Sequence, residues 1–156
     1  MVEGKRSEMN KQYVRITFQL DPANKQGVKT ESVWAEPVEH GQFRIANSPF
    51  YVFGISSEDV VAARETDGEL IFEDVLSRGG HSTYRVFLHE GRTIQSPEFM
   101  KYWTPISALG ATLENANDHF VAVDIPGDKD IRAICDLLDQ GEQDMVWSFE
   151  EGNYES

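Results

Sequence analysis

Apolar and polar positions alternate along the first half of the chain in short runs, and turn residues separate these runs. Within residues 13–20, the side chains of Val14, Ile16, Phe18 and Leu20 fall on one face, which predicts a strand with one solvent-facing side. Further strands are predicted at residues 30–35, 42–45, 50–53, 60–63 and 69–77. Short strands joined by tight turns predict a small β-barrel or a strongly bent sheet.

The connections between these strands carry turn signals. Gly41 and the pair Asp67-Gly68 favour hairpins, because two-residue turns need backbone conformations that glycine and aspartate tolerate. Pro37 is expected to end the second strand, since proline has no N–H to donate to a sheet. The densest run of apolar and aromatic residues, 32–64, spans several of these turns, and we expect the rest of the chain to be arranged around it.

The pattern changes after Gly79-Gly80. Residues 83–88 alternate as a strand, and Ser96-Pro97-Glu98 then supplies an N-cap, a first-turn proline and a first-turn acid, which predict the start of a helix. Pro105 is expected to kink or break that helix, because its ring clashes with the preceding turn. Gly110 is expected to end it.

Residues 111–114 and 120–125 predict a pair of strands, followed by another helix. The inner face of that helix is predicted to carry Ile131, Ile134, Cys135, Leu137 and Leu138. Gly141 is expected to end the helix, and residues 145–149 to return as a last strand. The order strand, helix, strand, strand, helix, strand predicts a ferredoxin-like arrangement.

We therefore expect an α+β protein with two lobes. A bent β-sheet or small β-barrel-like lobe is predicted at residues 12–80, and a ferredoxin-like (βαββαβ) lobe at residues 81–151. A length of 156 residues suits one domain or two small lobes that share a core.

The net charge of −13 is unevenly placed. Residues 1–113 hold 15 acids and 12 bases, whereas residues 114–156 hold 12 acids and 2 bases. The negative potential of such a protein repels nucleic acid and anionic membranes and attracts basic proteins. Neither nucleic acid nor a membrane is therefore expected as a partner. The alternative is an acidic protein whose carboxylates only keep its surface solvated.

Other features of composition favour a cytoplasmic protein. No apolar run approaches the ~20 residues of a membrane helix. The sequence MVEGKRSEMNKQ lacks the apolar core of a signal peptide. Cys135 is the single cysteine, which excludes an internal disulfide bond and a cysteine-rich zinc site.

The acidic end suggests a surface for a basic protein. Aromatic anchors inside an acidic rim suit such a partner, because the ring supplies buried area and the charge speeds encounter. The candidate partner-binding residues are Asp136, Asp139, Glu142, Asp144, Trp147, Glu150 and Glu151. The alternative for Trp147 is a place in the core while the acids solvate the surface.

The junction between the lobes is a second candidate site. Two glycines allow a close backbone approach, and His81, Ser82 and Arg85 could then contact a small ligand, such as an anion. The alternative is a purely structural joint, which needs the same glycines and caps its strand with the same hydroxyl groups.

No catalytic constellation is evident, and we expect no enzyme, no catalytic residue, no metal and no cofactor. The four histidines lack the spacing of zinc hydrolases, and the sequence has no phosphate-binding glycine loop. Glu36, Glu39 and His40 could perform acid–base chemistry or hold a metal. However, Pro37 and Gly41 place these three at a turn, where polar residues occur anyway.

Three segments of the chain form a recognisable set, namely VWAEP at 33–37, PFYVFGISSEDVV at 49–61 and GGHSTYRV at 79–86. Together they resemble a family of bacterial proteins, the domain of unknown function DUF4265. The resemblance implies no settled activity. Some small acidic proteins of this kind are immunity proteins encoded beside toxins, which implies an immunity or antitoxin function. Such a protein would bind and block a basic toxin domain that acts on nucleic acid or nucleotides. A small-ligand sensing or regulatory module is the alternative.

Overall fold

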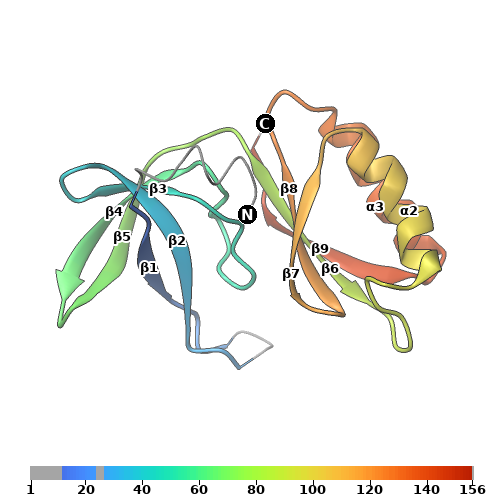
Figure 1. Cartoon of the computed structure of the whole chain (residues 1–156), viewed down its shortest axis with the longest axis horizontal. Helices are drawn as coiled ribbons and strands as arrows, with labels where there is room; N and C mark the ends of the chain where they lie inside the picture. The colour runs from blue at the N-terminus through green and yellow to red at the C-terminus, as the bar shows by residue number, and fades with distance from the viewer. Residues whose placement is uncertain (1–11, 24–26, 156) are drawn as a thin grey trace.

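The first lobe is a closed barrel in the structure, a computed structural model that describes residues 12–23 and 27–155. Its strands are β1 (Val14–Gln19), β2 (Thr30–Glu39), β3 (Gln42–Ile45), β4 (Val60–Thr66) and β5 (Glu69–Ser77). Consecutive strands pair antiparallel, and parallel pairing of β1 with β5 closes the barrel (Figure 1). Closure leaves no strand of this sheet with a free edge.

Alternation along the strands fills the barrel with apolar side chains. Ile16, Phe18, Val33 and Ala35 are buried in its core, as the period of two predicts. Asp67-Gly68 forms the turn between β4 and β5 with φ angles of 52° and 83°, which a two-residue hairpin of this type requires.

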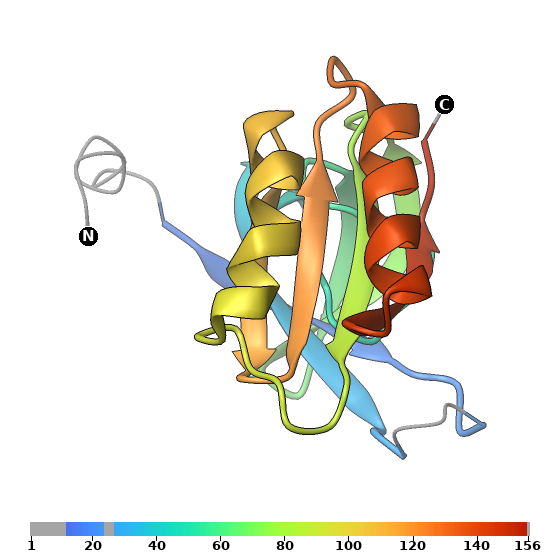
Figure 2. The same ribbon diagram turned by 90° about the vertical axis from the view of Figure 1, so that its right-hand side faces the viewer.

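The second lobe is a four-stranded antiparallel sheet with two helices on one face (Figures 1 and 2). Its elements are β6 (Ser82–Leu88), α2 (Pro97–Ala108), β7 (Thr112–Asn117), β8 (Phe120–Ile125), α3 (Ile131–Gln143) and β9 (Trp147–Asn153). The strands lie in the order β7-β8-β6-β9. The described chain is therefore a mixed α and β protein in which strands predominate.

The sheet of the second lobe is covered on both faces. Its helix-facing side chains form a second apolar core, separate from that of the barrel. On the opposite face, the ring of Phe120 contacts those of Phe50, Tyr51 and Phe87, at centroid distances of 5.7, 5.7 and 4.6 Å. Residues between β3 and β4 thus fill the face that a ferredoxin-like sheet would otherwise expose.

The strand predicted at residues 50–53 does not form. Instead, the Glu31 carboxylate accepts hydrogen bonds from the backbone N–H groups of Phe50, Tyr51 and Val52, at 2.5, 2.9 and 2.9 Å. A carboxylate can replace a neighbouring strand as the acceptor because it offers several lone pairs. The segment therefore stays irregular although its composition favours a strand.

Pro37 does not end the second strand, which continues to Glu39. The last residue of β2 that pairs with β1 is Ala35, so the proline lies beyond that neighbour. On the side of β3, Pro37 lies opposite Phe43 at a point where the register shifts. Proline is tolerated where the register shifts and the neighbouring strand has ended, because a regular ladder hydrogen bond from its nitrogen is not required there.

Pro105 does not interrupt α2 either. The helix begins after Ser96 as predicted and runs unbroken to Ala108. Pro105 and Lys101, whose carbonyl loses its partner, are both exposed, so water can solvate that carbonyl. In the part of the chain that the structure describes, no helix combines the length and apolar character needed to cross a membrane.

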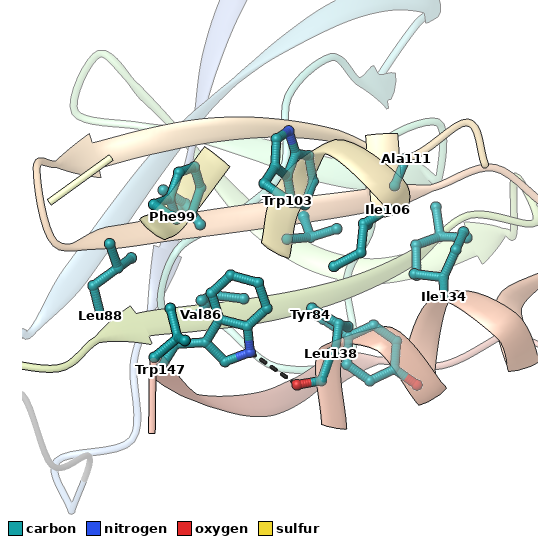
Figure 3. Packing of buried hydrophobic residues seen from close by; sticks show 14 residues of the cluster. Tyr84, Val86, Leu88, Phe99, Trp103, Ile106, Ala111, Ile134, Leu138 and Trp147 are labelled. Carbon is teal, nitrogen blue, oxygen red and sulfur yellow. Dashed lines mark hydrogen bonds between the residues drawn. The ribbon is translucent and has the colours of Figure 1, made fainter. Parts of the chain in front are cut away.

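Gly141 lies inside α3 and does not end it. The helix continues to Gln143, with Asp144 as its C-cap and Met145 at a positive φ of 64°. A Cβ atom on Gly141 would lie 2.4 Å from Cε2 of Trp147. The indole is fully buried and donates from Nε1 to the carbonyl of Leu138, 2.8 Å away (Figure 3). Glycine is needed here for close packing rather than for helix termination.

We predict that Gly141→Ala destabilises the protein. Alanine is the better helix former by about 1 kcal/mol, but overpacking a filled core costs about 1–3 kcal/mol. Urea unfolding should show a net loss of stability, whereas Gln143→Ala on the exposed side of the same helix should change little. A more stable Gly141→Ala protein would contradict the packing explanation.

We also predict that Glu31→Gln weakens the hold on the segment 50–52. An amide keeps one acceptor oxygen and turns its NH₂ group toward backbone donors, so buried N–H groups lose their partners. The expected cost is about 2–4 kcal/mol in urea unfolding. Hydrogen exchange should accelerate at the amides of Phe50, Tyr51 and Val52. Glu39→Gln, at the exposed end of the same strand, is the control, and equal stability of the two variants would refute the prediction.

Candidate functional site

Arg85 extends from the middle of β6 into the junction between the lobes and is fully buried. Its Nη1 donates to the carbonyl of Tyr51 at 3.2 Å, its Nη2 donates to the carbonyl of Val52, and the ring of Phe53 covers the guanidinium at 4.8 Å. Burial lowers the pKa of Arg85, and the charges of Glu31 and Glu150 oppose that shift. Residues 51–53 of the same protein therefore already contact the guanidinium of Arg85.

Asp59 forms a second buried polar centre at the junction. Its carboxylate accepts from the backbone N–H groups of Ser56 and Gly79, both at 2.9 Å, and from Arg78 Nη1 at 3.1 Å. A Cβ atom on Gly79 would lie 2.4 Å from the carbonyl oxygen of Glu58, so the glycine serves this close approach. This supports a structural role for the glycine pair.

His81 is also paired within the chain. Its Nδ1 lies 2.9 Å from both carboxylate oxygens of Asp124 on the neighbouring strand β8. Burial raises the pKa of Asp124, and the hydrogen bond with His81 opposes that shift. The pair links the residue that precedes β6 to β8 at the junction.

The three predicted ligand residues do not converge on one cavity. Ser82 points to the opposite side of β6 from Arg85, as strand alternation requires, and its Oγ accepts from the N–H of Glu155 at 2.8 Å. Ser82 lines a cavity of about 160 Å³ together with Gly80, Lys129 and Tyr154. Neither His81 nor Arg85 is among the described residues lining that cavity.

The predicted partner-binding carboxylates divide into groups. Asp136, Asp139 and Glu142 follow one another at a spacing of three along α3, and Glu151 lies on the helix-facing side of β9, opposite Tyr84. We call these four the acidic face. Burial raises the pKa of Cys135, and the charges of Asp136 and Glu151 raise it further, which places both acids beside that thiol.

The acidic face has no cationic partner among the described residues. None of the ion pairs in the described part of the chain includes its four carboxylates. Asp139 accepts from the side chain of Gln143, and Glu142 accepts from the backbone N–H of Phe149, so two of them have neutral donors.

The other two predicted carboxylates lie elsewhere. Glu150 is on the barrel-facing side of β9, 3.9 Å from Arg85 Nη1. Asp144 lies near α2, where it accepts from the hydroxyl of Tyr102 at 2.5 Å and from Gln140 at 3.1 Å. The hydrogen bond from Tyr102 lowers the pKa of Asp144.

Trp147 is not available to a partner, which corrects its place among the predicted contact residues. Its side chain is 0% exposed and packs against the ring of Phe99 (Figure 3) and against that of Tyr102. The structure therefore realises the alternative interpretation of this residue as part of the core. The physical reason is that β9 directs alternate side chains under α3.

The possible acid–base group is not assembled. Glu36 forms an ion pair with Arg44 at 3.4 Å, while Glu39 and His40 are exposed at the turn that follows. Within the part of the chain that the structure describes, no group of three or more His, Cys, Asp or Glu side chains could hold a metal ion.

Two features of the structure were missed from the sequence. The first is the role of Glu31. The sequence does carry a signal for it, because Glu31 falls on the same alternating face of β2 as the inward-facing Val33 and Ala35. The other is a cavity of about 650 Å³ lined by Tyr13, Trp34, Ala46, Asn47 and Glu114. No sequence signal joins these residues, because Glu114 comes from β7 in the other lobe.

Comparison with known proteins identifies a family but no activity. A hypothetical protein from Neisseria gonorrhoeae has a solved structure with a TM-score of 0.73 and 15% sequence identity, covering 94% of this chain and 96% of that one. At this identity the likeness shows the fold alone. No curated protein matches the chain. The family model described as "Domain of unknown function (DUF4265)" matches residues 31–149, and the chain therefore belongs to the DUF4265 family.

Proposed function

We propose that this chain is a protein-binding module of the immunity or antitoxin type rather than an enzyme. It would use the acidic face to bind and block a basic toxin domain that acts on nucleic acid or nucleotides. The single observation that supports this proposal most directly is the acidic face itself, whose four carboxylates form no ion pair among the described residues.

Like charges at this spacing carry a cost to the folded protein. Asp136 and Asp139 lie one helical turn apart, and both are exposed. Repulsion between neighbouring like charges on a helix costs about 0.2–0.5 kcal/mol per pair. A basic partner would remove this cost on binding and would be attracted over a distance by the negative potential.

An aromatic contact for the partner is still present, although Trp147 cannot provide it. Tyr154 follows β9 and is 49% exposed. Burial raises the pKa of Tyr84, and Glu151 and an ionised Tyr154 both raise it further, which places Tyr154 near the acidic face. Tyr154 could therefore supply the buried ring area that acidic residues alone lack.

The proposal also includes a ferredoxin-like fold for the second lobe and a location in the cytoplasm, both of which the sequence predicts. The element order after residue 80 and the strand order β7-β8-β6-β9, with both helices on one face, support a ferredoxin-like lobe at residues 81–151 after a barrel lobe at residues 12–80. We place the encounter with the partner in the cytoplasm. No nucleic acid, membrane or cofactor is part of this function.

We predict that removing charge from the acidic face slows binding of the toxin domain encoded beside this gene. The test variant is Asp136→Asn, Asp139→Asn and Glu151→Gln together. The matched control changes Glu65, Asp67 and Glu69 to their amides on the exposed hairpin of the barrel. The association rate should fall about ten-fold or more for the test variant at low salt, and the difference should shrink at high salt.

Surface plasmon resonance with the purified toxin domain gives these rates, and rescue of toxin-expressing cells gives the biological outcome. Equal association rates for the test and control variants would refute the role of the acidic face. Failure of the unchanged protein to bind any toxin domain encoded by an adjacent gene would refute the immunity function itself.

A further prediction concerns the free protein. The same triple variant should be more stable than the unchanged chain at low ionic strength, by about 0.5–1 kcal/mol, because it removes repulsion between the neighbouring carboxylates. The gain should disappear in 1 M salt, where the screening length is about 3 Å. Urea unfolding at both salt concentrations measures this, and a loss of stability at low salt would contradict the repulsion.

A further inference from the structure

We infer that the cavity between β2 and β7 is a binding site for an organic cation, namely a guanidinium or ammonium group. Tyr13 and Trp34 contribute aromatic walls from the barrel lobe, and Glu114 contributes a carboxylate from the sheet. The cavity of about 650 Å³ is large enough for an arginine side chain or a small amine. It lies apart from the acidic face on α3 and β9, so this inference does not rest on the proposed function.

The loop after β3 connects Trp34 to Glu114, which line the cavity from different lobes. The N–H of Trp34 donates to Asn47 Oδ1 at 2.7 Å, and the N–H of Ala46 donates to the carbonyl of Trp34 at 2.8 Å. The N–H of Ser48, the next residue along, donates to Glu114 Oε2 at 3.0 Å. Three consecutive residues thus connect the tryptophan of one lobe to the carboxylate of the other.

Trp34 is a wall of the cavity because of strand alternation. Its neighbours Val33 and Ala35 point into the barrel core, so the indole points outward and is 47% exposed. An exposed tryptophan costs free energy in a free protein and gains contact area when a ligand covers it. Trp103 and Trp147 are buried at 7% and 0% exposure, so Trp34 differs from the other two tryptophans.

The chemistry of the walls favours a cation over an anion or a neutral ligand. The face of an indole attracts ammonium and guanidinium groups, and the guanidinium of Arg15 already lies 5.0 Å from the centroid of the Trp34 ring. Arg15 is not among the described residues lining the cavity. The carboxylate of Glu114 adds a charge that attracts a cation and repels an anion. The net charge of −13 acts in the same direction.

The cation can come from a basic side chain of a partner protein or from a free amine, since both carry the same recognised group. The test therefore uses N-acetyl-arginine amide, N-acetyl-citrulline amide and choline. Citrulline has the shape of arginine but carries a neutral urea group. Choline represents free amines, and a hexapeptide with one central arginine represents a protein source.

The readout is the indole N–H signal of Trp34 in ¹H–¹⁵N NMR spectra, assigned by its loss in Trp34→Phe. We expect the arginine probe to shift this signal to saturation while the signals of Trp103 and Trp147 stay in place. The citrulline probe should bind at least about five-fold more weakly. Tighter binding of the hexapeptide than of choline indicates a protein source, and the reverse order indicates a free amine.

Glu114→Gln should weaken the arginine probe about three- to five-fold while keeping an oxygen that accepts from Ser48. Glu90→Gln, on an exposed loop, is the matched control and should leave binding unchanged. The inference is overturned if the Trp34 signal does not move, or if arginine and citrulline bind equally. It is also overturned if a folded Glu114→Gln protein binds as the control does. The comparison of arginine with citrulline uses the unchanged chain, so it stands even if Glu114→Gln fails to fold.

Discussion

Two buried charges hold one short segment from opposite sides, and the junction of the lobes depends on this arrangement. The carboxylate of Glu31, in the barrel, accepts from the N–H groups of residues 50–52. The guanidinium of Arg85, in the sheet, donates to the carbonyls of Tyr51 and Val52. Burying a charge is costly unless it is hydrogen-bonded, and here peptide dipoles replace the water that each charge loses. The guanidinium of Arg85 is hydrogen-bonded only when both lobes are in place, because its two carbonyl acceptors belong to the barrel lobe.

This junction determines which surfaces remain for function. The segment from the barrel covers the sheet face opposite the helices, with Phe50 and Tyr51 against Phe120. Ser56 and Thr83 share a further hydrogen bond of 2.6 Å across the junction. A face that is filled by the chain itself cannot receive RNA or a peptide. The surfaces that remain exposed among the described residues include the outer side of α3 with the β9 edge, and the cavity beside β7.

The two candidate surfaces share a chemistry although they lie on different elements. Both present carboxylates, and both have an exposed aromatic ring nearby, Tyr154 at one and Trp34 at the other. The polypeptide thus combines a junction in which Glu31, Asp59 and Arg85 are hydrogen-bonded to backbone groups with an outer surface that carries an excess of negative charge. A protein that acts by binding needs little else, because preorganised surfaces lose less entropy when a partner docks.

The sequence by itself determined the local elements, because their signals are local. Alternation located five of the six predicted barrel strands, Asp67-Gly68 located a hairpin, and Ser96-Pro97 located the start of α2. The negative charge of the carboxyl-terminal part is likewise a property of composition. The family resemblance was also present in short segments, and the match over residues 31–149 agrees with it.

Only the tertiary structure decided the roles that depend on distant neighbours. Residues 50–53 have the composition of a strand, but the carboxylate of Glu31 captures their N–H groups. Gly141 resembles a helix terminator, but the indole of Trp147 requires its missing side chain. Arg85 and Trp147 resemble binding residues, but both are buried. The barrel lobe covers Arg85, and α3 covers Trp147. Local sequence reports backbone preference, whereas burial and hydrogen-bond partners come from residues far along the chain, so these roles appear only once the chain is folded.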